Sequence, residues 1–569
     1  MKILPHCSAS SSRRLVQSLS LLFFFWLLWM MRAATTGYLP DWLPSDLYLR
    51  LDPLAAFALP LNIRRFVPSL LPGLGTVLIT LLLGRVFCGY LCPFGTTLDL
   101  VRFLGAKRKR RPESAAHPFP DGKQIPPRAP GSRSRHWGKY LLLTAILTAA
   151  AFGVNAVFAA SPISLITRFY TLFVFPLVQL TGKQGLDVLR PVADTLGLDA
   201  LAYMQVNVRR FETLCFVLFF FGVLFTLEQF RPRFWCRYLC PAGALLGLFS
   251  FHPLWRRRVS QCTSCGQCQR RCPMGAIDAS PSHTAHQECI ACRRCEAVCP
   301  KMTRFSASPV PQLAPPQNLP GLPGRRQFLQ AGLAGMACAA ASMLDLNSLQ
   351  LPAATGLLRP STLIRPPGAV PEENFLRLCL RCGACMQACP SNGLQPTYFL
   401  AGLAGIFSPV LVPRRGPCVA GCNACGQVCP SHALRRLVLE EKQHAKTGTA
   451  GILRRRCLAW NQDRRCVVCQ EVCPYGAISL RSLPGHRIPV PLVKADRCFG
   501  CGACECHCPV ASPAIIVEAA GALRLGKGSY IEAAHEAQLT LELVPQNEKD
   551  LSPGGEELPE GTLPPGFTE

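Results

Sequence analysis

The sequence predicts a multi-domain membrane protein in which a four-helix α transmembrane domain is followed by small, cysteine-rich α+β modules. Long apolar runs concentrate before residue 255, in a chain of 569 residues that is 49% hydrophobic and only 16% charged. Most of the 32 cysteines follow residue 255, and 24 of them fall in C-x2-C type runs that mostly end in Cys-Pro. Because that spacing is typical of metal-cluster ligands and not of disulfides, we predict ferredoxin-like [4Fe-4S] modules.

Four apolar segments are predicted to cross the membrane: 15–31, 66–87, 138–160 and 213–230. The Pro and Gly residues within 66–87 are tolerated where neighbouring helices pack against that segment. Residues 163–180 are also apolar, but they contain Arg168 and Pro176. We therefore predict that this fifth segment is interfacial or re-entrant.

Positive charge in the loops predicts the orientation. Segment 102–139 carries 11 Lys and Arg against two acidic residues, whereas segment 38–65 carries three. The positive-inside rule places the N-terminus, the 102–139 loop and the chain just after residue 230 in the cytoplasm. The formal net charge of +27 does not lead us to predict nucleic acid as a partner. Six clusters, each about −2 with its four thiolates, offset about 12 of those charges.

Two tandem runs have the spacing C-x2-C-x2-C-x3-C-P of a two-cluster ferredoxin, in which the fourth cysteine of each run binds the other run's cluster. The predicted ligand sets are Cys262, Cys265, Cys268 and Cys299 for one cluster, and Cys289, Cys292, Cys295 and Cys272 for the second. Zinc is the alternative for a lone C-x2-C pair, but four cysteines at this spacing, repeated, favour clusters.

The C-terminal part repeats the pattern with variations, which brings the predicted number of clusters to about six. The predicted ligand sets are Cys379, Cys382, Cys385 with Cys429; Cys418, Cys422, Cys425 with Cys389; Cys457, Cys466, Cys469 with Cys508; and Cys498, Cys501, Cys504 with Cys473. Cys457 lies nine residues before its nearest partner, and without it that site is a three-iron cluster or is empty. Cys506 is left over and is predicted not to be a ligand.

Two further cysteine pairs follow apolar segments: Cys88-x3-Cys92-Pro93 and Cys236-x3-Cys240-Pro241. Their surroundings are an internal repeat, GRVFCGYLCPFG against RPRFWCRYLCPAG. Spacing of i and i+4 puts both thiols of a pair on one face of a helix. The four thiols are candidates for a metal or redox site near the membrane surface, with packing residues or reduced thiols as the alternative. Three isolated cysteines are predicted to be inert small apolar residues: Cys7, Cys215 and Cys338.

The predicted domains follow from these features. They are a transmembrane domain with both C-x3-C-P motifs (1–254), a two-cluster module (255–302), a linker with a twin-arginine segment (303–350), two further two-cluster modules (351–440 and 441–546) and an acidic tail predicted to be disordered (547–569).

The paired C-x3-C-P motifs and the two ferredoxin runs after them resemble the NapH family, membrane ferredoxins associated with periplasmic nitrate reductase, over about residues 10–300. The second half resembles the NapG/MauM family, through Gly324–Leu329 (GRRQFL) and IRPPGAVPEENFLRLCLRCGACMQACP at 364–390. The whole chain resembles a NapH–NapG fusion. RRQFL before an apolar stretch of small residues resembles a Tat signal, which exports folded proteins, with an Arg-flanked surface helix as the alternative.

The resemblance implies a multi-pass protein of the bacterial inner membrane, with the first module cytoplasmic and the C-terminal modules periplasmic. It also implies quinol as electron donor, the membrane quinone pool as partner, and a periplasmic reductase, cytochrome or maturation system as acceptor. The sequence has no C-x-x-C-H haem motif and no G-x-G-x-x-G fingerprint, so we predict an electron-transfer subunit without a substrate-converting site. The alternatives are a cluster-containing assembly or regulatory protein, and a relay toward a cytoplasmic acceptor.

Overall fold

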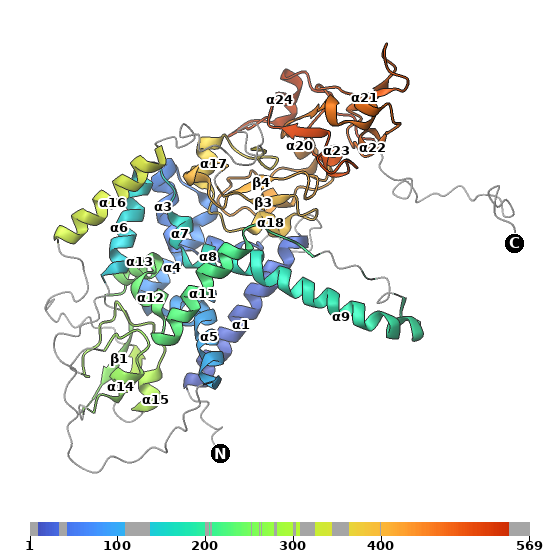
Figure 1. Ribbon diagram of the computed structural model, residues 1–569. Coiled ribbons are helices and arrows are strands. Elements are labelled where there is room, and N and C mark those ends of the chain that lie inside the picture. Colours follow the sequence, from blue (N-terminus) through green and yellow to red (C-terminus); the bar gives the residue numbers. More distant parts are fainter. Residues whose placement is uncertain are drawn as a thin grey trace. The chain divides into compact units, whose positions relative to one another are not determined.

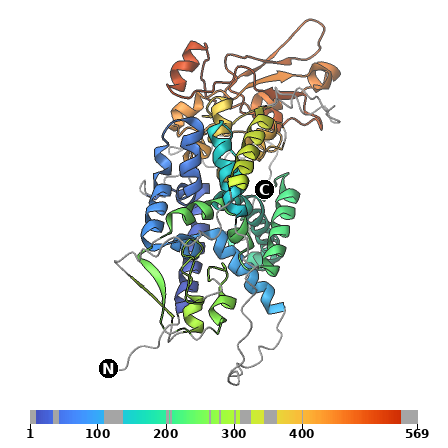
Figure 2. The same cartoon turned by 90° about the vertical axis from the view of Figure 1, so that its left-hand side faces the viewer.

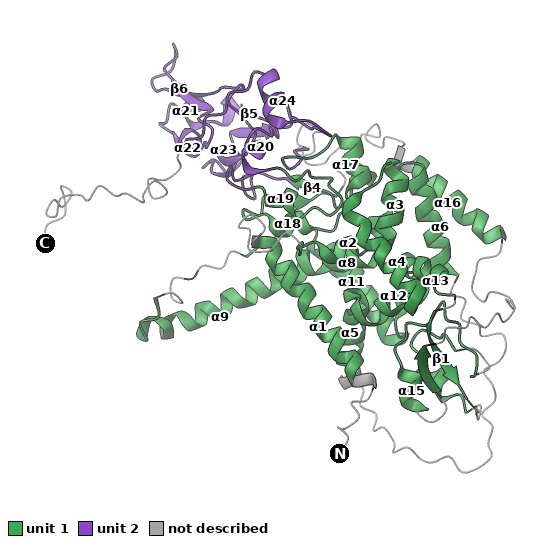
Figure 3. Ribbon diagram, turned by 180° about the vertical axis from the view of Figure 1, so that it is seen from behind, with its two compact units in different colours: residues 1–360, 368–410, 423–437 green, residues 361–367, 411–422, 438–569 purple. Residues whose placement is uncertain are grey.

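The computed structural model divides the chain into two compact units, coloured in Figure 3. Unit 1 comprises residues 1–360, 368–410 and 423–437, and unit 2 comprises residues 361–367, 411–422 and 438–569. The structure describes residues 9–33, 43–108, 137–199, 204, 208–251, 253–260, 262, 265–277, 281–299, 303–307, 325–343, 363–398 and 400–544. The predicted acidic tail, Cys7 and most of the basic 102–139 loop lie outside the described residues.

Unit 1 is built around a helical domain, drawn in blue to green in Figure 1. Its α-helices are α1 (Ala9–Met30), α2 (Leu47–Arg50), α3 (Pro53–Ile63), α4 (Leu71–Leu83), α5 (Pro93–Arg108), α6 (Gly138–Ala151), α7 (Val157–Ala160), α8 (Pro162–Phe169), α9 (Phe175–Thr195), α11 (Leu214–Phe230), α12 (Phe234–Tyr238) and α13 (Pro241–Phe249). Four short segments of 3-10 helix or π-helix join them: η1 (Met31–Ala33), η2 (Pro68–Leu70), η3 (Phe87–Leu91) and η4 (Tyr170–Val174). Of these, η3 and η4 are π-helical.

The predicted four-helix transmembrane domain is not supported. Three of the four predicted spans form shorter helices, namely α4, α6 and α11 with 13, 14 and 17 residues. Glycines with positive φ account for two of these lengths, since Gly84 (φ 76°) ends α4 and Gly153 (φ 86°) follows the last turn of α6. The fourth, α1, has 22 residues, but its first half carries Arg13, Arg14 and Gln17.

The segment predicted to be interfacial differs most from the prediction. Residues Pro162–Pro191 form one continuous helix, and among the described residues this helix alone is long and apolar enough to cross a membrane. That property by itself decides little, because a core helix of a soluble protein shares it. Every residue of α8 is buried, and its N-cap Ser161 accepts a hydrogen bond from Ser164 N–H and donates one to the buried Asp52. The first part of this helix, α8, therefore lies in the centre of the helical domain, whereas most of α9 is exposed and extends outward (Figure 1).

The first cysteine module packs on this domain. Its strands β1 (Trp255–Val259) and β2 (Thr303–Ala307) pair antiparallel, and its helices are α14 (Gln267–Arg271) and α15 (Arg294–Val298). A small core of Ile277, Ala291 and Phe305 packs around the module's cysteines. The module extends beyond its predicted end at 302, because β2 occupies residues that we predicted as linker.

A second module of unit 1 follows α16 (Arg325–Met343), which approaches α6 closely at Gly335. Its elements are α17 (Glu372–Leu378), α18 (Ala384–Ala388), β3 (Leu394–Pro396), η6 (Leu403–Gly405), β4 (Pro409–Leu411) and α19 (Ala424–Gln427), with β3 paired to β4. Fully buried Phe375 lies in its core.

Helix α1 connects the regions that hold the two modules. Its N-terminal part lies against α15 of the first module, and η1 at its other end lies against α18 and α19 of the second. Figures 1 and 2 show α15 and α18 near opposite ends of α1. The two modules therefore contact different parts of the same 22-residue helix and its extension η1.

Unit 2 contains two antiparallel strand pairs, β5 (Thr449–Ile452) with β8 (Ile515–Glu518), and β6 (Ile478–Arg481) with β7 (Val490–Val493). Its helices are α20 (Leu439–Gln443), η7 (Arg454–Arg456), α21 (Leu458–Gln462), α22 (Val468–Glu471), α23 (Ala503–Cys506) and α24 (Tyr530–Glu536).

Candidate iron–sulfur sites

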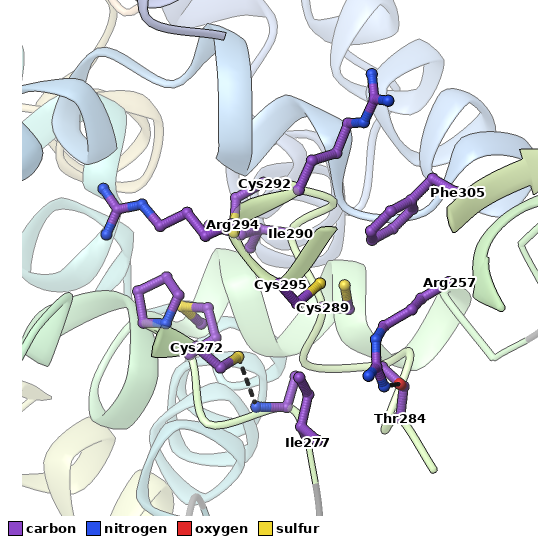
Figure 4. A pocket seen from close by; sticks show the side chains of 14 residues that line it. Arg257, Cys272, Ile277, Thr284, Cys289, Ile290, Cys292, Arg294, Cys295 and Phe305 are labelled. Carbon is purple, nitrogen blue, oxygen red and sulfur yellow. Dashed lines mark hydrogen bonds between the residues drawn. The ribbon is translucent and has the colours of Figure 1, made fainter. Parts of the chain in front are cut away.

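Four cysteines of the first module line one pocket, shown in Figure 4: Cys272, Cys289, Cys292 and Cys295. They are the set predicted from the crossed spacing of the two runs. The backbone turns tightly here, since Ala291 and Arg293 adopt positive φ values of 50° and 57°. The Ala276 N–H donates to Cys272 Sγ over 3.3 Å. The remaining lining combines apolar side chains with three arginines, Arg257, Arg293 and Arg294, whose positive charge suits an anionic cluster.

Burial controls the protonation of these thiols when no metal is bound. Burial raises the pKa of Cys289, and the neighbouring thiol of Cys292 raises it further. Burial also raises the pKa of Cys295, to about 12. Without metal these thiols stay protonated near neutral pH, whereas iron stabilises the thiolates directly.

The other predicted set of this module is described in part. Cys268 on α14 lies within electrostatic range of Cys262 and Cys265. Arg257 Nη2 donates to Cys268 Sγ over 3.5 Å, and Arg257 also donates to Thr284. Cys299 ends α15 as its C-cap residue, and its role as the fourth ligand stays a prediction.

The second module of unit 1 presents another pocket with four cysteines: Cys379, Cys382, Cys385 and Cys429. Cys385 lies within electrostatic range of the other three. The Leu434 N–H donates to Cys429 Sγ over 3.4 Å. Burial raises the pKa of Cys382 to about 12 and that of Cys429 to about 11.

The helical domain holds this second pocket by its backbone. Asn155 Nδ2 donates to the carbonyl oxygens of Arg377 and Cys379, both over 3.0 Å. Arg168 Nε, on the buried helix α8, donates to Arg381 O over 2.9 Å. These bonds fix the residues on either side of the first ligand, so the pocket is rigidly placed against the helices.

Two pockets in unit 2 repeat the arrangement, and their cysteines are Cys457, Cys466, Cys469 with Cys508, and Cys473 with Cys498, Cys501, Cys504. The first includes Cys457, which follows η7 and reaches the pocket despite its distance in sequence. Ala514 N–H donates to Cys508 Sγ over 3.4 Å, and Ala450 N–H donates to Cys498 Sγ over 3.3 Å.

The remaining predicted set draws on both units, since Cys389 and Cys425 belong to unit 1 and Cys418 and Cys422 to unit 2. Its assembly stays a prediction. Cys506 lies on α23, where Arg414 and Glu505 are its electrostatic neighbours. Cys215 is exposed on α11. The side chain of Cys338 lies outside the described residues.

The two C-x3-C-P pairs meet in the helical domain. Cys240 lies within electrostatic range of Cys236, Cys88 and Cys92, and the last of these is also buried. Sequence reasoning missed two buried arginines beside them, Arg85 and Arg233. The signal was present in the repeat, because each arginine stands three residues before the first cysteine of its pair.

Comparison with known families and proteins adds three matches to iron–sulfur families. A family described as a 4Fe-4S binding domain matches residues 66–112 and 213–259, which contain the two C-x3-C-P pairs. A 4Fe-4S dicluster domain matches residues 254–300, and another matches residues 464–512.

Curated relatives match larger stretches. The methylamine utilization ferredoxin-type protein MauM of Methylorubrum extorquens is 32% identical over 204 residues, 35% of this chain and 90% of the relative. The ferredoxin-type protein NapG of Escherichia coli is 37% identical over 212 residues, 36% of this chain and 87% of the relative. The putative electron transport protein YccM of Escherichia coli is 28% identical over 302 residues, 51% of this chain and 71% of the relative. The predicted resemblance to NapG and MauM is confirmed, whereas a fusion with a NapH-type protein stays a prediction.

Proposed function

We propose, on the premise that this chain belongs to the ferredoxin-type 4Fe-4S proteins related to MauM and NapG, that it relays single electrons across a membrane. The chain is an iron–sulfur electron-transfer protein in this family. The proposal adds the path: electrons move between cluster modules held at the two ends of one helical domain, toward a redox partner protein.

The observation that carries the proposal is the set of four pockets with four cysteines each. In each pocket the ligands come from two neighbouring motifs, as the crossed pairing of two-cluster ferredoxins requires. Two further sets, whose assembly stays a prediction, bring the proposed number of clusters to about six, four in the C-terminal half and two in the first module. When bound, such clusters exchange one electron each without making or breaking a substrate bond.

Exposed apolar side chains support a membrane location for the helical domain. One face of α1 exposes Leu15, Leu19, Leu22, Trp26 and Trp29 between the contacts that it makes with the two modules. Helices α4 and α11 also expose runs of large apolar residues, including Phe219 and Phe230 at 73% and 77%. Apolar surface of this extent favours contact with lipid. The helix Pro162–Pro191, which is long and apolar enough to cross a membrane, also supports this location.

In this arrangement the first module is cytoplasmic and the C-terminal modules are periplasmic. The basic residues of loop 102–139 support the cytoplasmic side, because positive loops stay inside. Arg325 and Arg326 support export of the later modules, since both are exposed at the start of α16, as recognition of a twin-arginine signal requires.

The proposed donor is quinol from the membrane pool, and the proposed acceptor is a periplasmic reductase, cytochrome or maturation system. Quinol oxidation releases two electrons and two protons, and the clusters take up the electrons one at a time. The support is the likeness to NapG and to a putative electron transport protein, together with the NapH-like motifs of the N-terminal half.

Anaerobic addition of a quinol analogue to the purified full-length protein tests this function. We expect EPR signals of reduced clusters to appear and to decay when a soluble electron acceptor is added. Clusters that dithionite reduces but that no quinol analogue reduces would instead favour an assembly or regulatory role. A reporter active only in the cytoplasm, when fused after residue 360, would favour a cytoplasmic acceptor.

A further inference from the structure

The four cysteines of the C-x3-C-P pairs form one enclosed group. Cys88 lies on η3, Cys92 and Cys240 cap the helices that follow the two pairs, and Cys236 lies on α12. Three of them are buried and Cys88 is half-buried. Cys92 lies within electrostatic range of Cys88 and Cys236, and Cys240 lies within range of all three others. Arg233 Nη1 of the second repeat donates to Cys88 O of the first over 2.9 Å, so the two pairs lie next to each other.

In the part of the chain that the structure describes, these thiols do not form a site for a single metal ion. Among the described residues, no three His, Cys, Asp or Glu side chains lie close enough to share one metal ion. That finding covers the ferredoxin-type pockets as well as this group. A tetrahedral zinc site needs its sulfur atoms within about 2.3 Å of one ion, whereas a cubane holds its ligands farther apart at four corners.

The two repeats enclose this group symmetrically. Each repeat reads R-x-x-C-x3-C-P-x-G, and each glycine packs against the arginine of the other repeat. A Cβ on Gly95 would lie 2.7 Å from Arg233 Nη1, and a Cβ on Gly243 would lie 2.6 Å from Arg85 Nη2. Each arginine is also close to the cysteines of both repeats. Arg85 lies within electrostatic range of cysteines from both pairs, and so does Arg233.

Near the thiols, the buried positive charges outnumber the buried carboxylates. Arg233 and Arg13 share the carboxylate of Asp99, over 2.8 and 2.6 Å. Arg85 and Lys139 share that of Glu288, with Arg85 at 3.4 Å.

The carboxylate of Glu228 accepts the N–H groups of Arg233 and Phe234 at the start of α12. Four buried cations thus face three carboxylates. Three of the four have cysteines of the two pairs as electrostatic neighbours, namely Arg85, Lys139 and Arg233. A cluster with four thiolates supplies about −2 and balances this excess, whereas four neutral thiols do not.

A hydrogen bond to sulfur repeats a feature of the other pockets. The Gly243 N–H donates to Cys240 Sγ over 3.2 Å. Equivalent backbone N–H groups donate to Cys272, Cys429 and Cys498 in the ferredoxin-type pockets. Such donors favour the charged thiolate over the thiol.

The position of the group connects it to both modules of unit 1. The Tyr90 hydroxyl donates to Ala291 O over 3.1 Å, next to Cys292 of the first module. Beyond Cys92, the Thr97 and Tyr170 hydroxyls share a hydrogen bond of 2.8 Å, which joins α5 to the central helix. Along that helix, Arg168 bonds the backbone of the second module at Arg381.

We infer that Cys88, Cys92, Cys236 and Cys240 together bind a seventh [4Fe-4S] cluster, inside the helical domain. The matching family names both segments as 4Fe-4S binding domains, and the structure shows that the two segments complete one site between them. The cluster exchanges one electron with the reduced or oxidised cluster next to it, and no bond is formed or broken. Its role as a relay rests on the proposed function, whereas its presence does not.

Metal analysis of the full-length protein, purified anaerobically, tests the inference. Seven clusters give about 28 iron atoms and about 28 labile sulfides per chain, and six give about 24 of each. Cys88→Ser and Cys240→Ser should each lower the iron content by about one to four atoms. The matched control is Cys215→Ser, which changes an exposed cysteine of the same domain and should leave both contents unchanged.

A wild-type chain with about 24 iron atoms would overturn the inference, and so would zinc bound in place of the missing iron. Unchanged iron in both variants would do the same. If a variant does not accumulate, the wild-type iron and sulfide contents still decide the question. If no quinol analogue reduces the protein but the variants lose iron, the proposed function fails and the seventh cluster stands.

Discussion

Replacement of Cys457 by Ser tests the least regular of the ferredoxin-type sites. In the structure, Cys457 lines the same pocket as Cys466, Cys469 and Cys508. A cubane that loses one of four thiolate ligands either releases the iron at that corner or is lost. We therefore expect the iron content to fall by about one atom if a three-iron cluster remains, and by about four if the site stays empty.

The assay is iron analysis combined with EPR of the oxidised protein, in which a three-iron cluster gives a signal and an intact [4Fe-4S]²⁺ cluster gives none. Cys506→Ser is the matched control, because Cys506 belongs to the same unit but has Arg414 and Glu505 as its electrostatic neighbours. Unchanged iron and an unchanged spectrum in Cys457→Ser would refute the assignment of this ligand. Iron loss of equal size in Cys506→Ser would show that the effect is not specific to the pocket.

Three further predictions concern the modules and their placement. Phe375→Ala empties a fully buried core position and should lower the free energy of unfolding by about 3–5 kcal/mol in chemical denaturation, whereas Phe328→Ala on the exposed face of α16 should change it little. Asn155→Ala removes two hydrogen bonds to the second module, which costs about 1–3 kcal/mol, and hydrogen exchange of residues 371–389 should accelerate while that of the first module stays constant. A reporter fused after residue 360 should be active in the periplasm, and the double substitution Arg325→Lys with Arg326→Lys should abolish that activity. If the C-terminal half is cytoplasmic, the reporter will show no periplasmic activity even before the substitutions.

The cluster ligands could be predicted from the sequence because their geometry is local. Three cysteines at short spacing wrap one face of a cubane, and the crossed fourth ligand follows from the tandem arrangement. Even Cys457 could be chosen as the nearest unassigned cysteine, and the structure brings it to the pocket. The sequence alone does not specify which segments approach the pockets from outside. Contacts such as Asn155 to Cys379 O join residues more than 200 positions apart.

The helical domain was predicted less well, because apolar composition does not specify where a helix ends. Gly84 and Gly153 stop two helices within segments that are apolar throughout, since glycine adopts positive φ without strain. Conversely, Arg168 led us to separate residues 163–180 from the helices. In the structure its guanidinium is buried and satisfied by carbonyl oxygens of Phe158 and Arg381, so the charge is no obstacle to a central helix.

The depth of the cysteine group along α1 gives the last prediction. Gly89, next to Cys88, accepts hydrogen bonds from Arg13 and Gln17, so the group lies beside the second and third turns of α1. The first module contacts the N-terminal part of that helix, and the second module contacts its C-terminal end. If a lipid-soluble quinol docks on the helical domain, the inferred seventh cluster is the proposed entry point for its electrons. We expect Cys88→Ser to prevent a quinol analogue from reducing the module clusters, while dithionite still reduces them as in Cys215→Ser. Normal reduction by quinol in a variant that has lost the iron would show that electrons enter elsewhere.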